Sequence, residues 1–64
     1  MTKLKEKRTE QGITQLELAV RSETNLRNLQ DYEQGHKDIN KACAITVYKL
    51  AQALNCKVED ILEI

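Results

Sequence analysis

The 64-residue chain contains no proline, phenylalanine or tryptophan, and it has only two glycines, two cysteines and one histidine. Glycine and proline are the residues that mark linkers and long loops, and with so few of them the chain shows no linker. It also shows no low-complexity tract. Its apolar residues are mainly Leu, Ile, Val and Ala, and charged residues are spread evenly among them, which is typical of a packed helical domain. We therefore expect an all-α fold and a single domain over residues 1–64.

The chain also lacks long apolar runs and a set of metal ligands. No stretch approaches the roughly 20 apolar residues that cross a bilayer, and no charged start precedes one, so we expect neither a membrane span nor a signal peptide. Cys43 and Cys56 are too far apart for the paired spacing of a zinc site, and the single histidine cannot complete four ligands. We expect two buried, reduced thiols in a cytoplasmic protein without metal or cofactor.

Charge and size narrow the possible functions. Ten basic side chains balance ten acidic ones, so the total charge by itself gives no attraction to nucleic acid. Residues 51–64 hold three acidic groups and one basic group, and we expect this end to face away from any polyanion. A domain of this size buries only about 60% of its unfolded surface, which leaves little room for a deep pocket. The sequence also shows no catalytic nucleophile paired with a general base, so we do not expect an enzyme. We expect no small-molecule ligand either.

Capping signals define the first two helical segments. The first segment spans about Thr2–Gln11. We expect Gly12 to end it, because a helix end favours a residue with a left-handed backbone, which glycine adopts readily. The second segment runs from Gln15 to about Ser22. It is preceded by Thr14, which forms the spacing of a capping box with Glu17.

Three further segments complete the expected fold. The third begins after Asn25, which can cap it, and ends at Gly35. The fourth follows a polar loop, His36–Asn40, and shows apolar residues at the i, i+3, i+4 and i+7 spacing of a buried helix face, namely Val47, Leu50, Ala51 and Leu54. Asn55 can end this helix in the left-handed conformation. A short fifth helix is expected around Val58, Ile61 and Leu62.

The two faces of the third segment differ in chemistry. At 100° per residue, one face carries Leu29, Tyr32 and Glu33. The opposite face carries Arg27, Asp31 and Gln34. We expect the first face to join the core and the second to face solvent.

The segment Gly12–Gly35 resembles the helix-turn-helix of the phage repressor and Cro family. The matching positions at its start are Gly12, Ile13, Thr14, Gln15, Glu17, Leu18 and Ala19. Those at its end are Leu29, Tyr32, Glu33 and Gly35. The resemblance extends with decreasing sharpness over nearly the whole chain. It implies a compact five-helix domain in which the helix-turn-helix proper spans about residues 15–34.

The resemblance also implies a function. A protein of this kind is a sequence-specific regulator of transcription, most simply a small repressor, that binds double-stranded DNA with its third helix in the major groove. Its second helix crosses the backbone, and two copies bind two half-sites as a homodimer. The family pattern further implies a partly buried ion pair between Arg8 and Glu33. For self-association we expect the apolar end of the chain, formed by Val58, Ile61, Leu62 and Ile64, although some of these residues must close the core.

The expected DNA contacts follow from the family pattern and from the exposed face of the third segment. They are Gln15, Asn25, Leu26, Arg27, Asn28, Asp31, Gln34, Lys37 and Lys41. Gln15 would bond a phosphate at a helix start, unless it is an ordinary surface residue. Arg27 would contact guanine, unless it only pairs with Asp31 in solvent. Leu26 would touch a thymine methyl or lie at the rim of the core.

The remaining expected contacts have their own alternatives. Asn25 and Asn28 would bond the DNA backbone or base edges, although capping is the main role of Asn25. Asp31 would accept a hydrogen bond from a cytosine amino group or pair with Arg27. Lys37 and Lys41, together with Asn40, would reach phosphates from the loop before the fourth helix.

Some features depart from the family pattern, and others favour a different use of the same fold. Glu23 stands where the family usually has glycine in the inter-helix turn, so the turn is expected to differ in detail. The loop after Gly35 is longer than usual and has no proline. The neutral total charge, Asp31, Leu16 and Leu26 instead favour a protein-interaction module, such as an antitoxin-like or adaptor subunit with weak DNA affinity.

Overall fold

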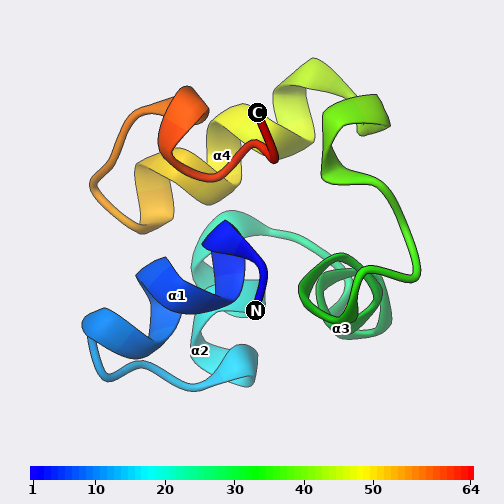
Figure 1. The fold of residues 1–64 in the computed structure, drawn as a ribbon. Coiled ribbons are helices and arrows are strands. Elements are labelled where there is room, and N and C mark those ends of the chain that lie inside the picture. The colour runs from blue at the N-terminus through cyan, green and yellow to red at the C-terminus, as the bar shows by residue number, and fades with distance from the viewer.

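The computed structural model describes residues 1–64 and contains four α-helices, two 3-10 helices and no strand. In chain order these are α1 (Lys3–Glu10), α2 (Gln15–Ser22), α3 (Leu26–Gln34), η1 (Ile39–Lys41), α4 (Ala44–Ala53) and η2 (Val58–Asp60). In Figure 1, α4 lies across the top of the molecule, α1 and α2 lie below it, and α3 is seen along its axis at the right. The all-α expectation is confirmed.

The expected fifth α-helix is instead the single 3-10 turn η2. Its hydrogen bonds run between residues three apart, from Asp60 N to Lys57 O and from Ile61 N to Val58 O. The backbone then turns so that Ile61, which is fully buried, enters the core. One α-type bond follows, from Leu62 N to Val58 O at 3.2 Å, and no further helical bond extends it, so the segment stays a single turn.

The predicted helix starts are confirmed. Thr14 Oγ1 accepts a hydrogen bond from Glu17 N at 3.1 Å, and Glu17 Oε1 accepts one from Thr14 N at 3.1 Å, which completes the capping box. Asn25 Oδ1 caps α3 by accepting from Arg27 N at 2.8 Å. The box and the Asn25 cap satisfy backbone donors that the first turn of a helix leaves free.

The turn between α2 and α3 keeps a left-handed residue even without glycine. Glu23 has φ 57° and ψ 34°, and its amide bonds to carbonyl oxygens of α2. Glu23 thus takes a conformation that glycine adopts more readily than residues with a side chain. A non-glycine residue in this conformation costs about 1 kcal/mol, so surrounding contacts must hold it.

The core forms where α2 packs against α3 and α4, with α1 and η2 closing one side. Its largest fully buried side chains are those of Leu4, Leu18, Leu29, Leu50, Leu54 and Ile61. The expected core faces of α3 and α4 are thus confirmed. Ile39 is also buried, although the sequence placed it in a polar loop.

Two expectations about surface and core are corrected. Cys43 is exposed at the start of α4, and Cys56 is half-buried, so neither thiol is fully buried, although both are free. Burial and the nearby Asp60 carboxylate raise the pKa of the Cys56 thiol. Ile61 belongs to the core and is unavailable for self-association, whereas Ile64 is 78% exposed. None of the helices is long and apolar enough to span a membrane.

Candidate nucleic-acid interface

Helix α3 presents a polar first turn to solvent and an apolar side to the core. The Arg27 side chain is 82% exposed, whereas Leu29 is completely buried two residues later. Leu26 is 36% exposed, and Gln34 is exposed at the other end of the helix. Residues at the N-terminal end of a helix that docks in a groove are the ones that reach base edges.

Asp31 is less exposed than its position on the helix wheel suggests. Its side chain is only 18% exposed, with Oδ1 3.8 Å from Arg27 Nε and 3.7 Å from His36 Nδ1. The backbone amides of His36 and Lys37 both donate to the Asp31 carbonyl oxygen, so the chain folds back over this residue. The alternative in which Asp31 pairs with Arg27 is therefore present in the structure. This pairing offsets part of the repulsion that the carboxylate exerts on phosphates.

Glu33 is the centre of a network that ties α3 to α1. Arg8 Nε and Nη2 donate to the two Glu33 carboxylate oxygens at 2.6 and 3.0 Å. Arg8 Nη1 also donates to the Ile13 carbonyl oxygen at 2.9 Å. The side chains of Arg8 and Glu33 are 12% and 1% exposed. The implied ion pair is thus present, and its two-pronged geometry fixes the angle between the helices.

Gln15 extends this network from α2 to α3. Its Nε2 donates to Glu33 Oε1 at 3.0 Å, and its Oε1 accepts from Gln30 Nε2 at 3.4 Å. One N–H of the Gln15 amide remains without a partner. The side chain therefore braces α3 and keeps a donor free. Gln30 was not expected in this network, because its bond to Gln15 depends on how the two helices cross.

The residues after α3 are only partly placed as expected. Lys37 Nζ donates to Asn28 Oδ1 at 2.7 Å, so these two expected contacts lie side by side. Lys41 is exposed in η1. Asn40 does not extend toward a ligand, because its side-chain amide donates to Glu63 O and accepts from Glu63 N, both at 2.9 Å. This pair of bonds fastens the loop to the C-terminal residues.

A contact that the sequence does not reveal holds the turn between α2 and α3. Lys49 Nζ of α4 donates to Glu23 Oε1 at 2.7 Å. This hydrogen bond and the charge of Lys49 lower the pKa of the Glu23 carboxyl. Because 26 positions separate the two residues, no local pattern predicts the pair. It fastens the left-handed turn to α4.

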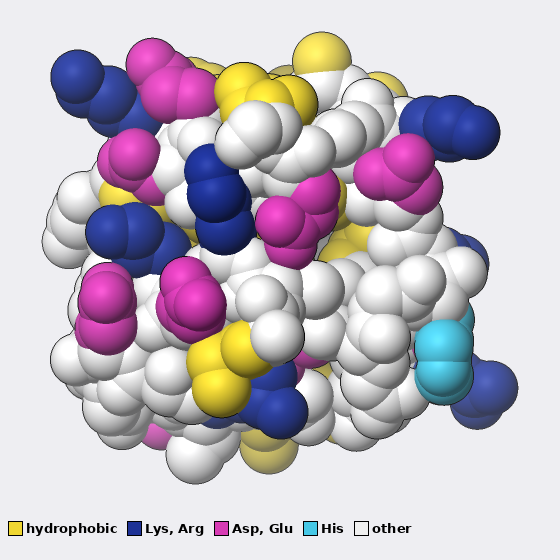
Figure 2. Space-filling model, viewed as in Figure 1, with side chains coloured by type: hydrophobic (Ala, Val, Ile, Leu, Met, Phe, Trp, Pro, Cys, Tyr) yellow, Lys and Arg dark blue, Asp and Glu magenta, His cyan; other side chains and the backbone are white.

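Positive charge is not concentrated on the face seen in Figure 2, where Lys and Arg side chains alternate with Asp and Glu side chains. Several surface charges of the chain pair locally, such as Lys7 with Glu10 at 3.6 Å and Arg21 with Glu17 at 3.8 Å. Exposed pairs of this kind contribute little to stability, but they cancel the field at a distance.

A helix-turn-helix family model matches residues 4–61. The chain belongs to the helix-turn-helix family. No curated protein and no solved structure matches it. The resemblance to phage repressor and Cro proteins is confirmed at the level of the family, whose members are DNA-binding regulatory domains.

In this helix-turn-helix protein, α2 and α3 form the motif and Glu23 lies in its turn. The expected contact residues Asn25, Leu26, Arg27 and Asn28 gather at the start of α3, and Lys37 joins them through Asn28. Gln15 is held at the crossing of α2 and α3 instead. Gln34 and Lys41 are exposed without a hydrogen bond to this group.

Proposed function

We propose that the protein regulates transcription by reading specific DNA sites with α3 in the major groove, while α2 crosses the backbone. The observation that carries this proposal is the contrast across α3, where Arg27 is 82% exposed and Leu29 is completely buried. A guanidinium at this place can donate two hydrogen bonds to one guanine, whose major-groove edge offers two adjacent acceptors. Leu26 lies beside it for contact with a thymine methyl group.

The network around Glu33 supports the same proposal. A reading helix must be held at a fixed angle, since base contacts depend on placement to a fraction of an ångström. Arg8 and Gln15 hold α3 through the Glu33 carboxylate, and the free N–H of Gln15 lies at the start of α2, where helix amides favour an anion. Lys37 and Lys41 add further contacts to phosphates. The simplest regulatory effect of such a small protein is repression by covering the site.

We further propose that two copies bind as a homodimer on DNA, because one helix of this length reads too few base pairs to be selective. Val58 and Leu62 line an apolar groove with residues of η1 and α4. Together with the exposed Ile64, this groove is the expected self-association surface.

The experiment that tests the function is selection of bound sequences from a random duplex pool at two salt concentrations. A DNA reader enriches a defined site at both salts, and its affinity decreases as salt rises. Recovery of no shared sequence, with binding lost at moderate salt, would contradict sequence-specific reading.

A protein-interaction module is the second candidate, because apolar side chains are exposed on two helices. Leu16 and Val20 on α2 are 60% and 69% exposed, and Ile45 and Tyr48 on α4 are 57% and 52% exposed. Exposed apolar groups of this size are common at contact surfaces. If the selection recovers no site but a partner protein depends on these residues, this second function replaces the first.

A further inference from the structure

The 3-10 turn η1 places its three side chains in three different surroundings. Ile39 is 4% exposed and belongs to the core. Asn40 bonds to the end of the chain, and Lys41 is exposed to solvent. A 3-10 helix has three residues per turn, so consecutive side chains leave it about 120° apart. Once the directions of Ile39 and Asn40 are fixed, the direction in which Lys41 leaves the turn is fixed as well.

Two hydrogen bonds join the Asn40 side chain to the backbone of Glu63. The Glu63 amide donates to Asn40 Oδ1, and Asn40 Nδ2 donates to the Glu63 carbonyl oxygen, both at 2.9 Å. The oxygen of an asparagine amide only accepts and its nitrogen only donates, so both bonds form in one orientation of the side chain. This pair of bonds, the Asn40–Glu63 clasp, therefore fixes the side of η1 that faces the end of the chain.

The segment that holds Asn40 is itself anchored. Glu63 Oε1 accepts from the backbone amide of Lys3 at 3.0 Å, and Lys3 Nζ donates to the Ile64 carbonyl oxygen at 3.0 Å. The Lys3 amide is one of the donors that the first turn of α1 leaves free. Ile61, two residues before Glu63, is completely buried. The clasp thus ties η1 to a segment that α1 and the core hold in place.

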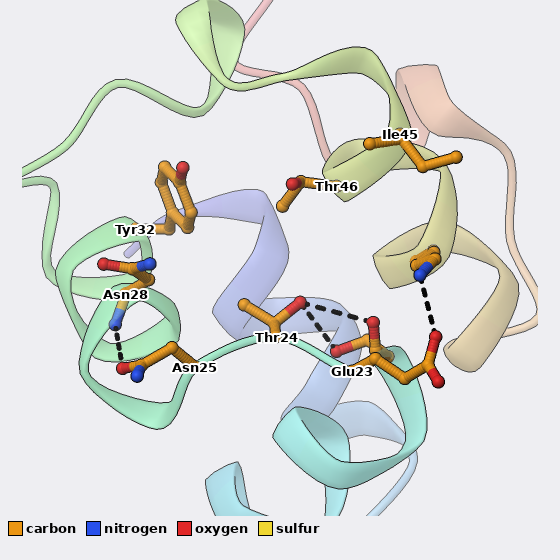
Figure 3. A pocket seen from close by; sticks show the side chains of 9 residues that line it. Glu23, Thr24, Asn25, Asn28, Tyr32, Ile45 and Thr46 are labelled. Carbon is orange, nitrogen blue, oxygen red and sulfur yellow. Dashed lines mark hydrogen bonds and ion pairs between the residues drawn. The ribbon is translucent and has the colours of Figure 1, made fainter.

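Of the three lysines between residues 37 and 49, Lys41 is the one without a partner. Lys37 Nζ donates to Asn28 Oδ1, and Lys49 Nζ donates to Glu23 Oε1, both at 2.7 Å. The second of these contacts is drawn in Figure 3. Lys41 forms no ion pair. Its ammonium can therefore donate to a phosphate without first losing a contact within the protein.

We propose that Asn40 is a positioning residue, which directs Lys41 toward the DNA backbone beside α3 through the Asn40–Glu63 clasp. The proposal rests on the proposed function, in which Lys41 contacts a phosphate. Asn40 does not touch DNA, because its side chain is turned toward Glu63. Without the clasp, η1 keeps its anchor at Ile39 but is free to rotate about it. The Lys41 ammonium then covers a larger volume, and holding it at one phosphate costs more conformational entropy.

The test uses two substitutions and their combination. Asn40→Ala removes the clasp at an exposed position, and Lys41→Gln removes the ammonium with little change in side-chain length. Gln52→Ala is the matched control for Asn40→Ala, because Gln52 is an exposed amide whose side chain bonds only to Tyr48. Binding is measured on the selected site and on a random duplex at several salt concentrations. Urea unfolding of each variant checks that the fold is retained.

We expect Lys41→Gln to weaken binding by about three- to tenfold at about 0.1 M salt and to reduce the salt slope by about 0.9 per subunit, the value for one phosphate contact. Asn40→Ala should weaken binding by about two- to fivefold and reduce the slope in the same direction, because it acts through the same ammonium. In the Lys41→Gln background, Asn40→Ala should cause no further loss. The Gln52→Ala control should bind as wild type does.

A loss from Asn40→Ala that stays equally large in the Lys41→Gln background would overturn the proposal. Asn40 would then act by another route, such as the adjoining groove at Val58 and Leu62. Unchanged affinity and salt slope for Asn40→Ala would also overturn it, and a lower free energy of unfolding alone would make the clasp a purely structural contact.

These outcomes are distinct from failure of the proposed function. If the wild type selects a site while the clasp has no effect, the proposed function stands and the positioning role is lost. If the losses from Asn40→Ala and Lys41→Gln are coupled on the random duplex but the wild type shows no base preference, the positioning role is supported and sequence reading is contradicted.

Discussion

Arg27 is the residue on which base recognition depends in the proposed function. Its side chain is exposed and its weak contact with Asp31 is long, at 3.8 Å. We expect Arg27→Ala to change the free energy of unfolding by less than about 0.5 kcal/mol, because no buried contact is lost. Binding to the preferred site should weaken by about 1–3 kcal/mol, with loss of preference at one guanine. Affinity measurements on single-base variants of the site check both effects.

Arg21→Ala is the control for Arg27→Ala. It removes the same charge from α2, where Arg21 pairs with Glu17 at the surface. It should leave base preference unchanged. A uniform loss over all sites for Arg27→Ala, equal to that of the control, would show that Arg27 contributes charge alone.

Asp31 should act in the opposite direction. Asp31→Asn keeps the size of the side chain but removes a negative charge that lies between Arg27 and His36. We expect affinity for random duplex DNA to rise by about two- to fivefold at low salt, because the carboxylate no longer repels phosphates and no longer neutralises Arg27. If Asp31 also accepts from a cytosine, preference at that base pair should weaken. Unchanged affinity for random DNA would place Asp31 away from the bound backbone.

Between the helices, the Arg8 and Glu33 pair joins α1 to α3. Arg8→Ala should lower the free energy of unfolding by about 2–4 kcal/mol, since it leaves the Glu33 carboxylate buried without its partner. Glu33→Ala should also destabilise, and the double variant should lose less than the sum. Urea unfolding measures all three variants. Additive losses would mean that the two side chains do not interact in solution.

The surface pair of Lys7 and Glu10 provides the comparison, because its side chains are 35% and 64% exposed. Removing either residue should cost less than about 0.5 kcal/mol.

The capping box of α2 should make stability depend on pH. The hydrogen bond from the Thr14 backbone amide lowers the pKa of the Glu17 carboxyl. Because this pKa is lower in the folded state, the stabilisation is present above the unfolded value, about 4.3, and is lost as pH falls through the folded value. Glu17→Gln should therefore differ most from wild type in Tm at neutral pH and converge with it near pH 3. Glu59→Gln, an exposed residue outside the cap, is the control, and a difference that stays constant with pH would contradict the linkage.

Helix starts and buried helix faces could be predicted from the sequence where they depend on residues close together in the chain. The Thr14 cap, the Asn25 cap and the apolar face of α4 depend on residues within one or two turns, and the structure has them as expected. Ile39 was missed because it is a single apolar residue among polar neighbours, and only the packing of distant helices buries it. η2 was expected as an α-helix because apolar spacing alone does not distinguish one 3-10 turn from an α-helical turn.

At the candidate interface, the exposure of Arg27 was easier to predict than the contacts between side chains. The family pattern indicated Gln15 and Arg27, and it implied the contact between Arg8 and Glu33. It gave no sign that Lys37 bonds Asn28 or that Lys49 holds the turn, because both contacts depend on how loops and helices fold onto one another.

For the whole molecule, a neutral total charge limits how strongly salt can act on DNA binding. We expect three to five phosphate contacts per subunit, so the logarithm of the binding constant should fall with the logarithm of salt concentration with a slope of about −3 to −4.5 per subunit. Binding isotherms at several salt concentrations give the slope. Binding that does not respond to salt would contradict the proposed interface.

The proposed homodimer predicts which stretch of DNA is protected in a footprinting experiment. A homodimer should protect two half-sites whose centres lie about one helical turn apart. Footprinting of the selected sequence measures this spacing. A single unpaired half-site would contradict the dimer and would leave the groove at Val58 and Leu62 without its expected role.

The contact between Lys49 and Glu23 also bears on how the turn between α2 and α3 responds to salt. Lys49 Nζ lies 2.7 Å from Glu23 Oε1, and the two side chains are 43% and 72% exposed. Dissolved ions screen an exposed pair of this kind. A rise in ionic strength therefore weakens the contact that offsets the cost of the left-handed backbone at Glu23, and the turn should open more often in concentrated salt than in dilute buffer.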